Sequence, residues 1–550
     1  MKTNKKRALV SSLLVAATTL SLCVSASATE LRGASTTSPY KPVVTLSSSS
    51  VSEVKNALRT TKDIQGNSLG PSDFVVSNNS VYLLNTANNA VYKYQGNEQT
   101  TAISLDDYDI VGTALSVRNN DVYVLDNNLS VSRISNGHEQ AIGSVQNDMD
   151  FDNAIDFSVT SKYVYVSEPT SDGGKTLCYL TDPSSGKLVL DRTVNGYMVD
   201  ENTFYRSKLI TENGENAGHS CVISILDAEG NTIDTITLHS DNYIAGAQYL
   251  GKNQDGLHIV KQFDMSCYSD GTCDVEETIR TVNTDNDVVT CDAVENNVPS
   301  MDNQVTVQDG KVYQFSSSNA RAVINEVNTE KMTPAAQFSS KLKQNPPVLS
   351  TVTNTTGSIE AKALPSISRS SVMRDAKAYH SSFTWSCSNK NLAALTNWKK
   401  PRYIKGAGTY SYMPYCWGGF STTAQYKTAM NNSGRVGNIN TPKSGHVANT
   451  YGLDCSGYVS RCWLQPTKYG TATIGTICNK ISYNALRTAD ALNKSGSHIV
   501  LFDYSDAAGN YTLYEATTLN QYDRVAHTSR SVKNLSSGGY VALSYKGITN

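Results

Sequence analysis

The sequence predicts a multidomain protein in which an all-β N-terminal region is followed by a C-terminal α+β region. Its 550 residues exceed the usual size of one domain, so at least two are expected. From about residue 64 to 330, short Val-, Tyr- and Ile-rich segments alternate with Asn, Asp and Gly turns. Charge also divides the chain: residues 369–550 carry 20 Lys and Arg against 7 Asp and Glu, whereas residues 29–368 carry 23 against 42. The net charges of +13 and −19 indicate that the two parts meet different surroundings or each other.

Residues 1–28 have the pattern of a secretory signal peptide. Four basic side chains precede an apolar run, residues 8–24, that is too short to span a membrane comfortably. The tripeptide Ala26-Ser27-Ala28 then forms a small-residue cleavage site. Residues 29–63 are rich in Ser and Thr and are predicted to be a loosely ordered lead-in. We therefore expect an exported protein without a membrane span.

One motif recurs in the all-β region: a strand, a polar turn and then a strand that contains Val-Tyr. Copies begin at Phe74, Leu115 and Phe157, which lie 41 and 42 residues apart. This spacing is the period of a four-stranded β-propeller blade, so residues 64–340 are predicted to form a propeller-like domain of about six or seven blades. Residues 190–300 fit the period less well, and we expect longer insertions there. A stack of β-sandwich modules is the alternative architecture.

The cysteines and acidic residues of this region match no metal motif. Cys267 and Cys273 flank a predicted hairpin tip, where they are candidates for a disulfide. Asp264, Asp270 and Asp274 bracket the same tip but lack the spacing of an EF-hand. The sequence also has no close Cys or His pairs with zinc-finger spacing. We predict neither a metal nor another cofactor.

After a predicted linker, residues 341–368, the α+β region contains a turn that leads into a helix. Asp454 is a good N-cap, which makes Cys455 the first helical residue. The positive end of a helix favours thiolate over thiol, and a thiolate is a reactive nucleophile. This position suits a cysteine hydrolase. The alternative is that a buried Cys455 serves only as a small apolar residue.

A histidine and an acid lie on neighbouring strands after this turn. His498 begins an apolar strand, and a second strand follows over residues 511–517. Folding the hairpin between them puts Glu515 about opposite His498. An acid beside an imidazole fixes its tautomer, and the imidazole can then deprotonate a thiol. His446, which precedes the cysteine, and His527, which follows the hairpin, are weaker candidates for the base.

A third piece is the loop from Met413 to Gly419, which reads Met-Pro-Tyr-Cys-Trp-Gly-Gly. Its two glycines predict a tight turn in which the backbone comes close to a ligand. The order of Tyr-x-Trp-Gly-Gly, Asp-Cys-Ser-Gly and a histidine at the start of a strand resembles the NlpC-type cell-wall cysteine peptidases of the papain-like superfamily. The resemblance covers residues 369–550. It implies an α+β papain-like domain in which a helix bearing the cysteine packs against a small antiparallel sheet.

The resemblance also implies a role for each matching residue. The implied catalytic residues are Cys455 as nucleophile, His498 as general base and Glu515 as the orienting residue. The implied substrate-binding residues are Tyr415, Trp417, Asp454 and Ser456. Glutamate departs from the family at the third catalytic position, where His, Asn or Gln is more common.

The family's function implies a secreted, cell-wall-associated peptidoglycan hydrolase. It would be a thiol protease that cleaves stem-peptide amide bonds, most often after γ-D-glutamate, through an acyl-enzyme. Its partners would be peptidoglycan stem peptides and anionic cell-wall polymers, and not nucleic acid. The propeller-like domain would position the enzyme, recognise a wall component or cover the groove. Two alternatives stay open: an N-acetylmuramoyl-L-alanine amidase or acyltransferase on the same fold, and a propeller-based cell-wall binding protein with an inactive hydrolase domain.

Overall fold

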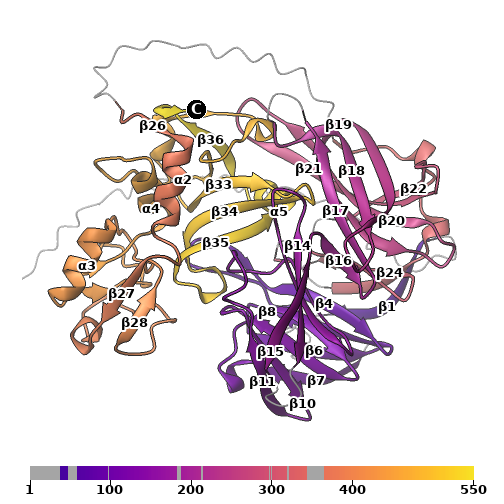
Figure 1. Ribbon diagram of the computed structural model, residues 1–550, viewed down its shortest axis with the longest axis horizontal. Coiled ribbons are helices and arrows are strands. Elements are labelled where there is room, and N and C mark those ends of the chain that lie inside the picture. The colour runs from indigo at the N-terminus through magenta and orange to yellow at the C-terminus, as the bar shows by residue number, and fades with distance from the viewer. Residues whose placement is uncertain are drawn as a thin grey trace, which may run out of the picture.

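A computed structural model describes residues 38–47, 58–96, 98–181, 187–211, 215–295, 298, 300–318, 321–342 and 364–550. The predicted signal peptide, most of the predicted lead-in and residues 343–363 of the predicted linker lie outside the described residues. Figure 1 shows an N-terminal body of strands, coloured indigo to rose, and a C-terminal part in orange and yellow that packs against it.

The N-terminal body is a β-propeller, as the repeat period predicted. In each of its first three blades, four consecutive strands pair in chain order to form an antiparallel sheet. The first blade consists of β4 (Pro71–Ser77), β5 (Ser80–Asn85), β6 (Ala90–Gln95) and β7 (Glu98–Ser104). The second consists of β8 (Gly112–Arg118), β9 (Asp121–Asp126), β10 (Ser130–Ser135) and β11 (His138–Ser144). The third consists of β12 (Asp156–Val159), β13 (Tyr163–Glu168), β14 (Lys175–Thr181) and β15 (Leu188–Val194).

The region that fits the period less well forms one seven-stranded sheet, not blades with long insertions. Its strands are β16 (Tyr197–Asp200), β17 (Thr203–Ile210), β18 (Gly218–Leu226), β19 (Thr232–Lys252), β20 (His258–Cys267), β21 (Cys273–Val282) and β22 (Val288–Ala293). The 21-residue β19 pairs with β18 through its first half and with β20 through its second half. Two blades therefore share one continuous strand.

The last blade joins strands from both ends of the propeller sequence. It consists of β23 (Val305–Gln308), β24 (Lys311–Ser318), β25 (Arg321–Val327) and, on its outer edge, β1 (Tyr40–Ser47). Because β1 pairs antiparallel with β25, the N-terminal strand closes the ring. Counting the seven-stranded sheet as two blades, the described part of the chain forms six blades.

The C-terminal part is organised around a six-stranded antiparallel sheet of order β31-β36-β32-β33-β34-β35. Its strands are β31 (Cys478–Lys480), β32 (Ala491–Lys494), β33 (His498–Ser505), β34 (Asn510–Thr517), β35 (Arg524–Ser531) and β36 (Val541–Tyr545). The α-helices are α2 (Arg369–Lys377), α3 (Thr423–Asn431), α4 (Cys455–Cys462) and α5 (Val532–Ser537).

Short elements complete both parts of the molecule. The two-stranded pairs are β2 (Thr61–Lys62) with β3 (Ser68–Leu69), β26 (Ile367–Ser368) with β37 (Ile548–Thr549), β27 (Thr384–Cys387) with β28 (Gly408–Ser411), and β29 (Arg435–Val436) with β30 (Thr450–Tyr451). The 3-10 helices are η1 (Asp106–Tyr108), η2 (Thr329–Lys331), η3 (Ala335–Gln337), η4 (Asn389–Leu392), η5 (Ile474–Ile477), η6 (Tyr483–Ala485) and η7 (Leu519–Gln521).

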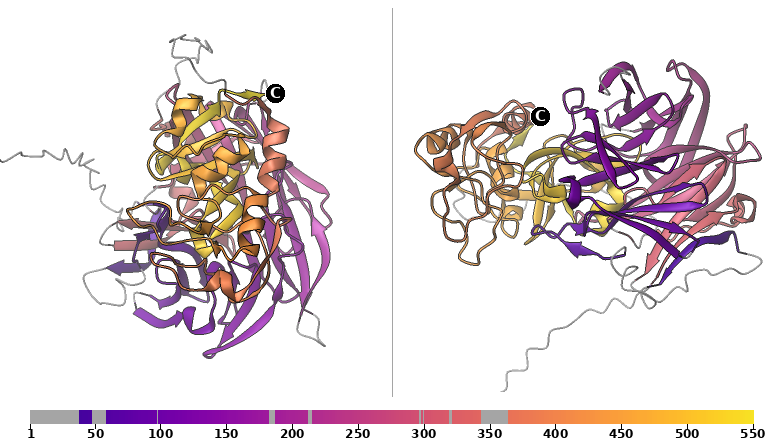
Figure 2. Two further views of the ribbon diagram at one scale, coloured as in Figure 1. Left: turned by 90° about the vertical axis from the view of Figure 1, so that its left-hand side faces the viewer. Right: turned by 90° about the horizontal axis from the view of Figure 1, so that it is seen from below.

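The central strand β33 is buried on both faces, which explains its unbroken apolar run. Ile499 and Leu501 belong to a hydrophobic core that includes residues of α2 and α4. Val500 and Phe502, on the opposite face, pack in a core that includes residues of the propeller strand β20. The sheet thus lies between α2 and α4 on one side and the propeller on the other, while α5 packs on the propeller side (Figure 1 and Figure 2).

None of the ten cysteines among the described residues forms a disulfide. Cys267 and Cys273 face each other across the β20–β21 hairpin, and the predicted hairpin is therefore confirmed, but no disulfide joins them. Within the described residues, no helix has the length and apolar character needed to cross a membrane.

Candidate active site

Cys455 is the first residue of α4, where the local sequence places it. The Asp454 carboxylate accepts a hydrogen bond of 2.7 Å from the Gly457 N–H and caps the helix, as predicted. The same carboxylate accepts a 2.9 Å hydrogen bond from the Gly418 N–H and pairs with Lys468. These contacts hold the Cys455 sulfur at the start of α4, where the helix dipole is positive.

The glycine-rich loop packs directly beside this helix start. Gly418 has φ of +73°, a left-handed conformation that favours glycine. A Cβ on Gly419 would lie 2.6 Å from the carbonyl oxygen of Gly452, so the second glycine allows a close backbone approach. The Cys416 N–H also donates to the Leu453 carbonyl at 2.9 Å. The predicted tight turn is therefore present, and this hydrogen bond joins it to the segment that leads into Cys455.

Tyr415 is fully buried beside the thiol. Burial, and then the neighbouring Cys455 and Asp454, raise the pKa of its phenol well above 10, so the hydroxyl keeps its proton. This hydroxyl has no hydrogen-bond partner among the described residues. It is thus a neutral donor available to an oxygen atom of a bound molecule. Trp417, in the same loop, packs against the hydrophobic core and donates its backbone N–H to the Asn438 carbonyl at 2.8 Å.

His498 opens β33 with no exposed surface, and its ring lies near a thiol and a carboxylate. Its Nε2 lies 2.6 Å from Oε2 of Glu515, and the Cys455 sulfur is close enough to raise the pKa of the ring. Because Leu501 pairs with Tyr514, the register places Glu515 diagonal to His498 rather than directly opposite it. The diagonal position lies on the same face of the sheet, so the predicted contact forms.

The contacts of His498 favour its charged form. Burial lowers the pKa of the imidazole, but Tyr540, the Cys455 sulfur and the hydrogen bond to Glu515 outweigh burial and raise this pKa well above 6.5. A protonated imidazole stabilises a neighbouring thiolate. These contacts therefore favour a charged imidazole wherever both of its ring nitrogens can carry a proton.

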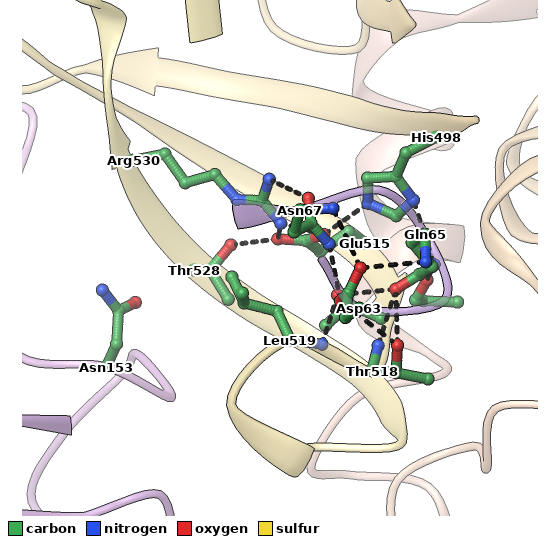
Figure 3. A network of polar contacts seen from close by, with 12 residues as sticks. Asp63, Gln65, Asn67, Asn153, His498, Glu515, Thr518, Leu519, Thr528 and Arg530 are labelled. Carbon is green, nitrogen blue, oxygen red and sulfur yellow. Dashed lines mark hydrogen bonds and ion pairs between the residues drawn. The ribbon is translucent and has the colours of Figure 1, made fainter. Parts of the chain in front are cut away.

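Glu515 is a buried carboxylate with a full set of partners, drawn in Figure 3. Arg530 donates to its two oxygens at 2.7 and 2.6 Å, and the Thr528 hydroxyl donates to Oε1 at 2.7 Å. Burial raises the pKa of this carboxyl, but Arg530, His498 and Thr528 together lower it to about 2. Glu515 therefore stays ionised at neutral pH and can orient the imidazole.

The two rival histidines have other surroundings. The Nε2 of His446 lies 3.0 Å from the Thr450 carbonyl oxygen in its own loop. His527 stacks on Phe151 and Tyr514, with ring centroids 3.9 and 4.0 Å away, and burial lowers its pKa. The imidazole whose pKa the Cys455 sulfur raises is that of His498.

Asp454 and Ser456, which were predicted to bind substrate, are buried in the turn. The Ser456 hydroxyl donates to Oδ1 of Asp454 at 3.2 Å. These contacts give both side chains a structural role in the turn. Substrate binding by either residue stays a prediction.

Sequence reasoning missed two groups that reach this site. Arg530 lies on β35, where Thr528 and Arg530 occupy alternate positions and offered a weak signal of a polar sheet face. Gln65 comes from the β2–β3 hairpin, and its Nε2 lies 3.0 Å from Nδ1 of His498 (Figure 3). No local pattern marks Gln65, because it is 433 residues away from His498 in the sequence.

The acidic residues near the β20–β21 tip have separate partners. Asp264 pairs with Arg280 at 2.9 Å, and Asp274 accepts a 2.7 Å hydrogen bond from the Tyr268 hydroxyl. In the part of the chain that the structure describes, no group of three or more His, Cys, Asp or Glu is arranged to hold a metal ion.

The comparisons with known proteins concern the propeller. No protein-family model matches the sequence, and no curated protein matches it. Among solved structures, the WD40 β-propeller domain of Doa1 is 11% identical over 50% of this chain and 99% of that one, with a TM-score of 0.27. BamB from Moraxella catarrhalis is 9% identical over 52% and 99%, with a TM-score of 0.27. Virginiamycin B lyase from Staphylococcus aureus is 14% identical over 50% and 86%, with a TM-score of 0.26. At these values the likeness carries no inference about activity, and the propeller is assigned from its strand order.

Proposed function

We propose that this protein is a secreted peptidoglycan hydrolase, a cysteine endopeptidase of the NlpC type that cleaves stem-peptide amide bonds. One observation carries the proposal: a cysteine at a helix N-terminus lies near an imidazole that a buried glutamate holds through Nε2, and the cysteine sulfur raises the pKa of that imidazole. A thiolate, a base and an orienting acid are the parts that nucleophilic attack on an amide requires. The order of the motifs in the sequence, set out above, suggests the family.

In the proposed reaction, the Cys455 thiolate attacks the carbonyl carbon of the scissile amide. The carbon–sulfur bond forms, and the developing oxyanion accepts hydrogen bonds from backbone N–H groups at the start of α4 and from the Tyr415 hydroxyl. The imidazolium of His498 gives its proton to the leaving amine as the carbon–nitrogen bond breaks. Neutral His498 then takes a proton from water, and the hydroxide hydrolyses the thioester and restores the thiol. Glu515 keeps the imidazole oriented throughout.

The proposed partners are peptidoglycan stem peptides and anionic polymers of the wall. The net charge of +13 on residues 369–550 supports attraction to an anionic polymer. Export through the predicted signal peptide would bring the enzyme to this substrate.

The test is digestion of purified peptidoglycan by the full mature chain and by its Cys455→Ala variant, with the fragments identified by mass spectrometry. We expect new amines on stem peptides and a loss of at least about 10³-fold in rate for Cys455→Ala. Cys462→Ala is the matched control, because Cys462 is also buried and lies at the other end of the same helix. This variant should cleave at the wild-type rate.

The fragments also separate the alternatives. Release of intact stem peptides that carry a free L-alanine amine would identify an amidase, and transfer of the acyl group to an added amine would identify an acyltransferase. Wall binding without fragments from any variant would favour the binding protein with an inactive domain. Normal cleavage by Cys455→Ala would refute the nucleophile assignment.

A further inference from the structure

The β2–β3 hairpin, Thr61–Leu69, stands apart from the propeller blades. Its turn is organised by Asp63, whose carboxylate accepts hydrogen bonds of 2.9 Å from the Gln65 N–H, the Asn67 N–H and the Asn67 side chain. Gly66 has φ of +77°, a left-handed conformation that completes the turn. This turn holds Gln65 in a fixed position at the tip.

Gln65 projects from this tip into the candidate active site, as Figure 3 shows. Its Nε2 lies 3.0 Å from Nδ1 of His498 and donates to the Ala516 carbonyl at 3.0 Å. Its Oε1 accepts hydrogen bonds from the Thr518 N–H at 2.7 Å and from the Thr517 hydroxyl at 3.1 Å. Only 2% of Gln65 is exposed, and both polar atoms of its carboxamide have hydrogen-bond partners.

The position of this carboxamide conflicts with the proposed chemistry. Glu515 takes Nε2 of His498, which leaves Nδ1 as the nitrogen that can exchange a proton with a thiol or a water molecule. A carboxamide N–H that donates to Nδ1 occupies the same lone pair. The ring of His498 has no exposed surface while the hairpin is seated. A peptide carbonyl and a hydrolytic water both need access to this nitrogen.

The rest of the hairpin binds the surroundings of the catalytic groups. The Ser497 hydroxyl, next to His498, donates to the Gln65 carbonyl at 2.6 Å. Arg530, which holds Glu515, also donates to Oδ1 of Asn67 at 3.1 Å. The hairpin is thus attached at three points around one imidazole.

These contacts can break without a large cost in free energy when the hairpin leaves the site. They are hydrogen bonds between polar groups, which water can replace at small net cost. Ile64, the large apolar residue of the turn, is 43% exposed and adds little burial. Behind the hairpin, Gly66–Leu69 form part of the wall of a cavity of about 510 Å³ at the propeller channel, so the segment does not back onto a close-packed core.

We propose that the Thr61–Leu69 hairpin is an intramolecular inhibitor, which seats the Gln65 carboxamide on the catalytic imidazole and must leave before a peptide can enter. The proposal rests on the proposed function of this site. It predicts that the intact chain is held in a low-activity state and that removing the carboxamide raises activity.

The first test measures two quantities on the full chain with Gln65→Ala: the rate of Cys455 alkylation by iodoacetamide, mapped by mass spectrometry, and kcat/KM for a soluble stem peptide. Both should rise at least about tenfold, because several hydrogen bonds that seat the hairpin are lost. Gln95→Ala is the matched control, since Gln95 is an exposed glutamine at the end of β6 in the first blade, and it should change neither rate.

A second test locks the hairpin. A Cβ built on Gly66 lies 3.9 Å from the Ser497 Cβ, within the range that a disulfide requires. The double variant Gly66→Cys, Ser497→Cys should lose cleavage and alkylation when oxidised and regain both when reduced with dithiothreitol. Each single variant, treated in the same way, controls for oxidation of Cys455.

The outcomes separate this proposal from the proposed function. Faster alkylation of Cys455 in Gln65→Ala without any peptidoglycan cleavage would support the inhibitor and overturn the peptidase. Unchanged alkylation in Gln65→Ala, or full cleavage by the oxidised double variant, would overturn the inhibitor. Slower alkylation and slower cleavage in Gln65→Ala would also overturn it, because Gln65 would then be a group that positions His498.

Discussion

At the scale of single residues, Glu515 connects the candidate catalytic histidine to the rest of the protein. Its carboxylate contacts His498 on one side and Arg530 and Thr528 on the other. A buried charge is tolerated only when it is paired and hydrogen-bonded. In this network, Glu515 is the charged partner of both His498 and Arg530. Changing one member therefore affects orientation, protonation and stability together.

Glu515→Gln should lower kcat by about 10²-fold and change KM little, because the imidazolium loses its anionic partner while the substrate contacts remain. Steady-state kinetics on a soluble stem peptide measure both constants. Thr528→Val is the matched control: it removes one hydrogen bond to the same carboxylate but leaves the charge. A kcat loss for Thr528→Val as large as that for Glu515→Gln would show that packing, and not charge, is responsible.

The same carboxyl predicts a pH dependence of stability. The pKa of Glu515 is about 2 in the folded protein, below its ordinary value of 4.5, so its ionised form stabilises the fold. This contribution is complete above about pH 4.5 and is lost as the pH falls toward about 2. Denaturant unfolding at several pH values should show the free-energy difference between wild type and Glu515→Gln shrinking over that window. A difference that stays constant from pH 6 to pH 2 would contradict the lowered pKa.

The sequence contained enough information to place Cys455 at a helix start and Glu515 beside His498, because a cap determines the first and one hairpin the second. The approach of the cysteine to the histidine was expected only from the family resemblance. Strand alternation and a short turn determine which acid meets the histidine, although the register proved diagonal. Gln65 was beyond such reasoning. Its contact with His498 depends on how two parts of the chain dock, and no local pattern encodes that docking.

At the scale of elements, α4 depends on its cap. Asp454→Ala should destabilise the protein by about 1–2 kcal/mol, because the Gly457 and Gly418 N–H groups both lose their acceptor. Asp454→Asn keeps an N-cap oxygen and should cost less than half as much, although it loses the charge that pairs with Lys468. Denaturant unfolding of both variants measures these costs. Equal losses for the two would mean that the ion pair, and not the cap, holds the helix start.

The propeller shows where periodicity succeeds and where it fails. The first three blades obey the predicted period, because most of their strands end at a turn that contains Asn, Asp or Gly. In the seven-stranded sheet, β19 runs through Ser240, Asp241 and Asn242, a polar triplet with the composition of a turn. The residues before the triplet pair with β18 and those after it pair with β20. This pairing keeps the triplet extended, so tertiary contacts override the local signal.

At the scale of the whole molecule, the propeller and the C-terminal part share a core, and Asp152 is a polar anchor between them. The Asp152 carboxylate lies 2.7 Å from Nε2 of His380 and 2.9 Å from a guanidinium nitrogen of Arg524. It also accepts a 2.8 Å hydrogen bond from the His527 N–H. Burial raises the pKa of Asp152, but His380 and Arg524 lower it below its usual range.

Asp152→Ala should lower the free energy of unfolding by about 3 kcal/mol or more, because it leaves Arg524 buried without its anion. Asp150→Ala is the control: its side chain is 85% exposed, and the change should cost less than about 0.5 kcal/mol. Calorimetry of both variants tests the difference. If the Asp152→Ala variant were as stable as the Asp150→Ala variant, the Asp152 carboxylate would not anchor the interface.

The separation of 433 positions between Gln65 and His498 in the sequence imposes an order of events on biosynthesis. A ribosome releases the N-terminal hairpin long before it releases the strand that bears the histidine. Under the proposed inhibition, the inhibitory hairpin would therefore be made before the groups that it covers. This order would protect the wall of the producing cell if the chain is the exported hydrolase proposed above.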